Sequence, residues 1–196
     1  MRIVSIAALS FVLSVAAFAV DLGKPSPAFT IQQLNGKPTL SLTQFKGKVV
    51  ALALMDTECP HCQNLTQILN GVSKEYAAKG VQVVGCYFND AAPQILPSFI
   101  QRFQPVFPVG YSNGSAVRQY LSWSELKPLY VPHMVFLDRR GVVRADIAGE
   151  NDFMRDPATN VRKQLDEMLK PASTTRTRKP QPATKSTASV AVPSHP

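Results

Sequence analysis

The hydrophobic and polar positions between Val20 and Lys170 follow two periods in turn. Residues 47–54 and 81–88 are largely continuous apolar runs, which is typical of strands covered on both faces. Residues 65–76 instead place apolar side chains three or four positions apart, which predicts a helix with one apolar face. We expect Lys79-Gly80 to end this helix, because glycine adopts the left-handed cap conformation at little cost.

Further segments continue this alternation along the chain. Two short strand-like runs flank Asn35-Gly36, the dipeptide that most strongly indicates a hairpin. The remaining pattern predicts helices over 93–104, 116–121 and 157–169, an extended segment over 105–111, and strands over 133–138 and 142–149 around a turn. This order predicts an α/β domain in which helices cover both faces of a mixed sheet.

The two ends of the chain differ in composition from this middle part. In residues 1–19, Arg2 precedes an apolar run that ends in Ala17-Phe18-Ala19, so we expect a signal peptide cleaved after Ala19. The alternative is a retained membrane anchor, for which the run is slightly short. A cleaved leader leaves no stable membrane insertion and places the protein in the periplasm or an equivalent extracytoplasmic compartment, where disulfides persist.

Residues 171–196 form a basic segment rich in proline, serine and threonine, which we expect to be a disordered, solubilising tail after the domain of residues 20–170. The whole chain has a formal net charge of +8. Arg2 accounts for one unit and the tail residues Arg176, Arg178, Lys179 and Lys185 for four, so the domain between them has a charge of +3. This mild excess does not favour nucleic acid as a partner.

Two cysteines, Cys59 and Cys62, stand two residues apart directly after the apolar run 47–54. Structural zinc sites take four ligands, commonly from two such pairs, and here the third cysteine is the distant Cys86. Haem attachment requires histidine immediately after the second cysteine, where Gln63 stands. A structural disulfide across so short a loop adds little stability. The pair therefore favours thiol–disulfide exchange without metal or cofactor.

The position of the pair supports this chemistry. Cys59 follows a buried strand and precedes a helix, whose N-terminal N–H groups and dipole stabilise a thiolate. Pro60 fits the first helical turn, and His61 adds a polar neighbour that favours the thiolate. We expect Cys59 to be the attacking thiol and Cys62, one turn later, to be less exposed and to resolve the mixed disulfide.

Four blocks of sequence resemble a known family. The chain is similar to extracytoplasmic thioredoxin-fold thiol–disulfide oxidoreductases of the TlpA/ResA-like, redoxin branch, from about Gly23 to Lys170. The matching blocks, in the order of that branch, are residues 40–62, 80–90, 107–111 and 131–149. The resemblance implies a thioredoxin-like fold with an N-terminal hairpin and a helical insertion before the strand that follows a cis-proline.

By this resemblance, Pro132 is the cis-proline that faces the cysteine pair. Val131 would then offer backbone groups to a substrate strand, as in β-strand addition. The partners implied are protein thiols and disulfides and an upstream redox protein, and we expect a monomer. Within the same chemistry a peroxidase is disfavoured, because Asp56 stands where peroxiredoxins have a threonine.

Several residues depart from the family pattern. Glu58 replaces the usual tryptophan before the first cysteine, Ala53 replaces a buried aspartate of thioredoxins, and Leu65 replaces a glutamate of some members. Asp56 or Glu58 is a candidate proton acceptor for Cys62, the alternative being an ordinary solvated loop carboxylate.

Three other residues bear on the interpretation. Cys86, in an apolar run, is expected to be a small buried hydrophobe, and Trp123 to pack at the edge of the helical insertion. The alternative from another functional class is a Sco-like copper-binding module, in which Cys59, Cys62 and His133 would bind Cu(I).

Overall fold

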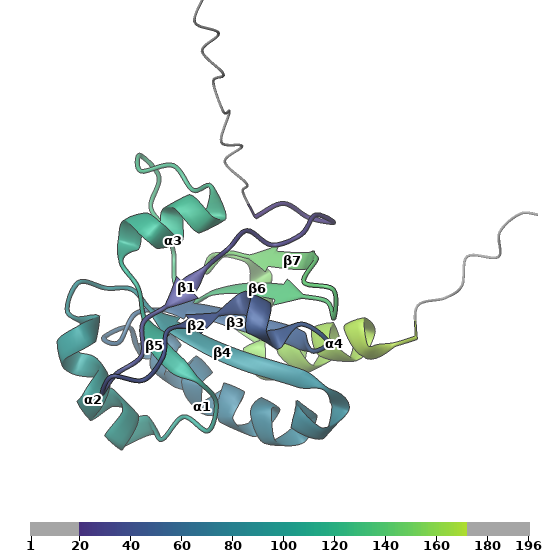
Figure 1. Ribbon diagram of the computed structural model, residues 1–196, viewed down its shortest axis with the longest axis horizontal. Coiled ribbons are helices and arrows are strands. Elements are labelled where there is room, and N and C mark those ends of the chain that lie inside the picture. The colour runs from purple at the N-terminus through teal and green to yellow at the C-terminus, as the bar shows by residue number, and fades with distance from the viewer. Residues whose placement is uncertain (1–19, 172–196) are drawn as a thin grey trace, which may run out of the picture.

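A five-stranded mixed sheet forms the centre of the protein (Figure 1), whose computed structural model describes residues 20–171. The predicted leader and residues 172–196 of the predicted tail lie outside the described residues. The strands, in the spatial order β5-β4-β3-β6-β7, are β3 (Val49–Met55), β4 (Val81–Tyr87), β5 (Val109–Tyr111), β6 (His133–Leu137) and β7 (Val143–Ile147). β3, β4 and β5 are parallel, whereas β6 and β7 are antiparallel to their neighbours.

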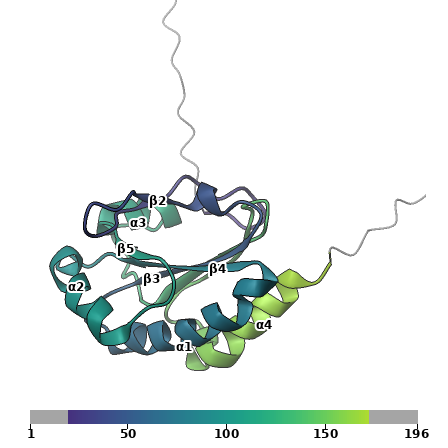
Figure 2. The same cartoon turned by 60° about the horizontal axis from the view of Figure 1, so that its bottom comes forward.

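Helices and the N-terminal strands cover the two faces of this sheet (Figure 2). The helices are α1 (Pro60–Tyr76), α2 (Ala92–Phe103), α3 (Gly114–Leu121) and α4 (Pro157–Leu169). Side chains of α1, α2 and α4 build the hydrophobic core on one face, and side chains of α3 and the N-terminal segment build a second core on the other. The mixed sheet with helices on both faces, predicted from the sequence, is confirmed.

The predicted hairpin is an antiparallel pair of two-residue strands, β1 (Thr30–Ile31) and β2 (Leu40–Ser41). Asn35 and Gly36 lie in the loop between them with φ angles of 59° and 68°, the left-handed region that these residues tolerate best. The loop is longer than the tight two-residue turn that Asn-Gly usually forms. A 3₁₀ helix, Leu42–Phe45, follows β2 and is held by a reciprocal capping box between Ser41 and Gln44.

Alternation along β3 explains why the central strand is apolar throughout. Every residue from Val49 to Met55 is buried, the odd-numbered side chains in the core beneath α1 and the even-numbered ones in the core of the opposite face. β3 runs directly into the segment that contains the cysteine pair, so the buried strand fixes where α1 begins. Within residues 20–171, no helix is both long and apolar enough to cross a bilayer.

The remaining predicted boundaries agree closely with the structure. α1 ends at Tyr76 and continues as the 3₁₀ helix Ala77–Lys79, which Gly80 closes with φ 84°. α4 spans the predicted residues, and a third 3₁₀ helix, Asp152–Arg155, precedes it. α2 contains Pro97 in its interior, and the helix continues through this residue.

Candidate active site

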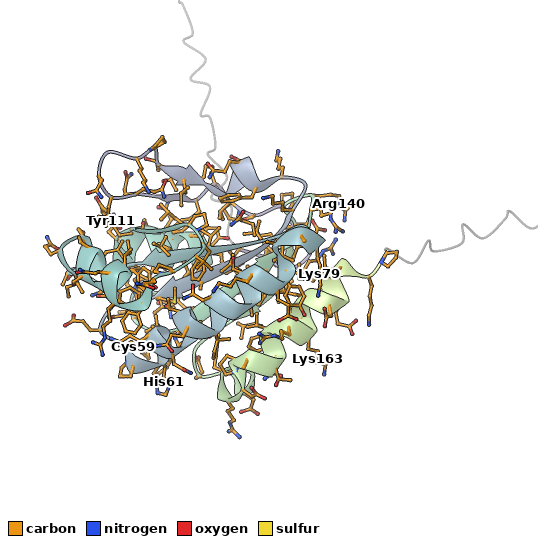
Figure 3. All side chains as sticks on the ribbon, turned by 90° about the horizontal axis from the view of Figure 1, so that it is seen from below. Cys59, His61, Lys79, Tyr111, Arg140 and Lys163 are labelled. Atoms are coloured by element: carbon orange, nitrogen blue, oxygen red, sulfur yellow. The ribbon has the colours of Figure 1, made fainter. Side chains whose placement is uncertain are left out.

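The cysteine pair lies at the N-terminal end of α1, where Figure 3 shows Cys59 beside His61. Cys59 is the N-cap residue, with φ −74° and ψ 120°, and Pro60 is the first helical residue. Cys59 is half-buried and His61 is exposed, whereas Cys62 is 0% exposed within the core beneath α1. The predicted difference in exposure between the two thiols is therefore present in the structure.

The environment of Cys62 favours its neutral form. Burial raises the pKa of the Cys62 thiol far above that of a free cysteine, and the nearby Cys59 and the Asp56 carboxylate raise it further. The backbone N–H of Asp56 opposes this shift by donating a hydrogen bond to Cys62 Sγ, at 3.5 Å. Cys62 consequently has to lose a proton at the moment when it acts as a nucleophile.

Carboxylates near the pair come from the loop between β3 and α1. Asp56 is half-buried, and its Oδ1 accepts a hydrogen bond from the N–H of Glu58 at 2.7 Å, while Glu58 is exposed. Ala53 and Leu65, two of the positions that depart from the family pattern, are fully buried in the apolar core. The assignment of either loop carboxylate as the proton acceptor for Cys62 stays a prediction.

A side-chain clamp that the sequence analysis missed holds this loop. Asn89, just after β4, accepts a hydrogen bond from the N–H of Thr57 at 3.1 Å and donates one to Thr57 Oγ1 at 2.8 Å. Gln63 of α1 donates to the carbonyl of Thr57 at 3.0 Å. The predicted order of strands gave one indication of this contact. The carboxyl ends of the parallel strands β3 and β4 meet at one edge of the sheet, so the segments that follow them lie close together.

Three other residues predicted for the site line one groove. A cavity of about 450 Å³ lies beside α1 and includes His61, Val131 and Pro132 on its walls. The Val131–Pro132 peptide bond is cis, as the resemblance implied. Within residues 20–171, no hydrogen bond engages the backbone N–H or C=O of Val131. The groove therefore presents a backbone edge beside the first turns of α1.

Gly149 closes the far wall of this groove. A Cβ atom at this position would lie 2.8 Å from the carbonyl carbon and 2.9 Å from the carbonyl oxygen of Tyr130, and 2.9 Å from the N of Val131. The Gly149 N–H also donates to the carbonyl of Tyr130, at 3.3 Å. Only glycine permits this close approach, so Gly149 supports the backbone that precedes the cis-proline.

His133 lies on the opposite face of the sheet from the cysteines. The neighbouring strand residue Met134 packs in the core with Cys62, and alternation directs His133 into the other layer. There its Nε2 contacts Asp146 Oδ1 at 2.6 Å, and its ring meets Trp123 edge-on at 5.9 Å. The structure does not support the alternative of a Sco-like copper module, because His133 lies on the other face of the sheet from Cys62.

The third cysteine is also remote from the pair. Cys86 is fully buried in the core of the opposite face, and burial raises the pKa of its thiol. The expectation of a small buried hydrophobe is confirmed. Among the described residues, no group of three or more histidine, cysteine or carboxylate side chains is arranged to hold a metal ion.

The profile of the family described as Redoxin matches residues 21–165. The chain belongs to the redoxin family. Thiol-disulfide oxidoreductase ResA of Bacillus thuringiensis subsp. konkukian (strain 97-27) is 28% identical to this redoxin over 151 residues, which are 77% of this chain and 78% of the relative. Thiol:disulfide interchange protein DsbE of Pseudomonas fluorescens biotype C is 28% identical over 134 residues, 67% of this chain and 68% of that protein.

Solved structures agree on the fold of this redoxin. A thiol:disulfide interchange protein of the thioredoxin family from Chlorobium tepidum TLS has a TM-score of 0.60 at 22% identity, covering 76% of this chain and 98% of that one. A thiol:disulfide interchange protein from Bacteroides sp. has a TM-score of 0.61 at 19% identity, covering 81% and 96%. This redoxin is thus a TlpA/ResA-like thiol–disulfide oxidoreductase with a thioredoxin fold, as predicted.

Proposed function

We propose that this redoxin exchanges disulfides with protein substrates outside the cytoplasm, with Cys59 as the attacking thiol and Cys62 as the resolving thiol. The observation that carries the assignment is the difference between the two sulfur environments. Cys59 caps α1 and is half-buried, two residues before His61 of the groove wall, whereas Cys62 is fully buried with a raised pKa. A substrate sulfur therefore has access to Cys59 and not to Cys62.

In the reducing direction the Cys59 thiolate attacks one sulfur of a substrate disulfide. The substrate S–S bond breaks, its other sulfur leaves as a thiolate, and a mixed disulfide with Cys59 forms. Cys62 then loses its proton and attacks the Cys59 sulfur, which releases the second substrate thiolate and forms the Cys59–Cys62 disulfide. The substrate gains two electrons and the dithiol loses two. A partner dithiol restores the enzyme, and oxidation of substrates follows the same steps in reverse.

The groove supports a polypeptide as the substrate. The backbone of Val131, which has no hydrogen-bond partner within residues 20–171, offers one N–H and one C=O to an extended segment, and Pro132 and His61 line the same groove. Backbone hydrogen bonds of this kind give affinity without requiring a particular side chain, which suits an enzyme that acts on disulfides in different contexts.

The compartment is inferred from residues 1–19, whose apolar run and Ala17-Phe18-Ala19 ending favour export. The expected mature protein begins at Val20. N-terminal sequencing of the protein recovered from the envelope of an expressing bacterium checks this. A first residue other than Val20, or recovery only from the cytoplasm, would contradict it.

The test of the two thiol roles is substrate trapping. Cys62→Ser should accumulate mixed disulfides through Cys59, because the resolving thiol is gone, and Cys59→Ser should trap almost none. Non-reducing electrophoresis with and without dithiothreitol measures the adducts. Both variants are made in a Cys86→Ser background, since that buried thiol lies outside the site. Equal trapping by the two variants, or adducts through Cys62, would refute the assignment.

A further inference from the structure

A cluster of basic side chains covers the end of the domain opposite Cys59. We call this surface the basic pole and define it as Lys46, Lys48, Lys79, Arg139 and Arg140, all exposed. Hydrogen bonds to backbone carbonyls hold its segments together. The N–H of Gly47 donates to the carbonyl of Arg139 at 2.8 Å, and Arg139 Nη2 donates to the carbonyl of Lys79 at 3.5 Å. Figure 3 shows Lys79 and Arg140 far from Cys59 and His61.

The charge of the basic pole is largely uncompensated. Asp138 lies beside it, but its Oδ2 is shared between Arg140, at 3.4 Å, and Arg144, at 2.6 Å. Within residues 20–171, the other four members of the basic pole form no ion pair with a carboxylate. Residues 1–19 and 172–196 contain no acidic residue that would neutralise them.

The opposite end of the molecule is acidic. Asp56, Glu58, Asp90 and Glu150 lie in the segments around the cysteine pair and its groove, and none of them has an ion pair among the described residues. The domain has a net charge of only +3, but its unpaired cations lie at one end and these unpaired carboxylates at the other. A negatively charged surface will attract the basic pole and turn the cysteine pair away from itself.

A cavity also lies at the basic pole, and part of its lining is apolar. This cavity, of about 310 Å³, lies between Lys46 and Arg140. Its lining includes the apolar side chains of Leu42, Phe45 and Leu137. It also includes Asp138, whose carboxylate is paired with Arg140 and Arg144. Cations beside apolar side chains suit a phospholipid, whose phosphate pairs with the cations while its glycerol and upper acyl carbons contact the apolar side chains. A nucleic-acid backbone offers the phosphate but no aliphatic group that would contact the apolar side chains of the cavity.

The C-terminal segment leaves the domain near this surface. α4 ends at Leu169 on the side of the molecule where Figure 3 labels Lys79 and Arg140. The 25 residues that follow Pro171 contain Arg176, Arg178, Lys179 and Lys185. The sequence that follows the described domain thus adds four cations to the chain.

We propose that the basic pole docks this redoxin on a bilayer surface rich in anionic phospholipid, with the cysteine pair facing the aqueous phase. Docking is peripheral and electrostatic, and the C-terminal cations strengthen it. The choice of a bilayer rests in part on the proposed location outside the cytoplasm. The enzyme would thereby be held near membrane-associated substrates while its groove stays open to them.

The experiment is sedimentation of the chain of residues 20–196 with lipid vesicles. Vesicles of equal parts phosphatidylglycerol and phosphatidylcholine should bind the protein, phosphatidylcholine alone should not, and added salt should release it. The triple variant Lys46→Glu, Arg139→Glu, Arg140→Glu should bind at least about a hundredfold more weakly, because each cation near such a surface strengthens binding roughly fivefold. Replacing the four tail cations by glutamine should weaken binding further.

The matched control is Lys37→Glu, Arg102→Glu, Lys127→Glu, which changes the net charge equally at exposed positions outside the basic pole. It should retain most of the binding. Equal losses in the two triple variants, absence of binding by the parent chain, or tighter binding to duplex DNA than to vesicles at the same salt would overturn the proposal. Both variants should reduce a soluble disulfide at the parent rate, so that failure of docking is distinguishable from failure of the proposed redox function.

Discussion

At the scale of single residues, Gly149 shows how the groove depends on the absence of a side chain. The backbone atoms of Tyr130 and Val131 that a Cβ at this position would meet are unable to rotate away. We expect Gly149→Ala to displace Val131 and to cost about 1–3 kcal/mol of folding free energy, as other overpacked sites do. Exchange with a protein disulfide should slow at least tenfold, whereas exchange with a small aromatic disulfide should change little.

Urea unfolding and stopped-flow exchange with both disulfides check this expectation. Gly114→Ala serves as the control, because its Cβ would meet nothing within 4 Å. Equal slowing with the small and the protein disulfide would show that Gly149 supports the cysteine pair itself rather than the substrate-binding backbone.

Several of these residues were predictable from the sequence, and others were not. Cys59, Cys62 and the cis-proline at Pro132 follow from a local motif and a family resemblance. The orientation of His133 does not, because every residue of β6 is buried. The apolar residues 134–137 that follow His133 give no indication of which alternate side chains face α1. The role of Gly149 depends on a contact between two loops, which no local pattern encodes.

At the scale of elements, the segment between β3 and α1 is held from a neighbouring strand. Thr57 is 2% exposed, and Asn89 satisfies both its N–H and its hydroxyl. Asn89→Ala leaves these groups buried without a partner, which we expect to cost about 1–3 kcal/mol. Because Thr57 lies two residues before Cys59, the rate of exchange through Cys59 should fall as well.

Asn113→Ala is the matched comparison for this variant. Asn113 caps α3 by accepting a hydrogen bond from the N–H of Ala116 at 2.7 Å, and its loss should cost about 1 kcal/mol. Thermal unfolding should therefore report a loss for both variants, and only Asn89→Ala should alter the exchange rate. An unchanged rate in Asn89→Ala would mean that the loop keeps its geometry without the clamp.

Most element boundaries followed from periodicity, since strands β3 and β4 and helices α1 and α4 show strong apolar patterns. The β1–β2 loop was harder to predict. Asn35-Gly36 indicated a hairpin correctly, but the two strands are only two residues long, because the chain here also packs on Tyr111 of β5. Tertiary contacts of this kind override a local turn signal.

At the scale of the whole molecule, buried weak acids make the stability of the fold depend on pH. Burial raises the pKa of the thiols of Cys62 and Cys86 and of the phenols of Tyr87 and Tyr120. It also raises the pKa of Tyr76 to about 12, with a further contribution from the hydrogen bond that Tyr76 donates to Asp166. Each folded-state pKa exceeds its unfolded value, so the folded state keeps protons that the unfolded chain releases.

The stabilising contribution of these groups is complete below the unfolded pKa values, about 8.5 for cysteine and 10 for tyrosine, and is lost as the pH rises above them. We therefore expect the free energy of unfolding to fall steeply from about pH 9 upward. Urea titrations at neutral and alkaline pH measure it. The oxidised protein should lose less than the reduced one, because the disulfide removes the titration of Cys62. A flat profile up to pH 11 would contradict the prediction.

Because it contacts His133, Trp123 is an intrinsic fluorescence probe of the strand that follows the cis-proline. Trp123 is the only tryptophan of the chain, and its indole N–H donates to the carbonyl of Pro128 at 3.1 Å while the ring meets His133. Its fluorescence therefore comes from a single place, beside the residue that follows the cis-proline. A change in emission when a polypeptide enters the groove would record movement of this strand in real time, without a dye and without any turnover of thiols.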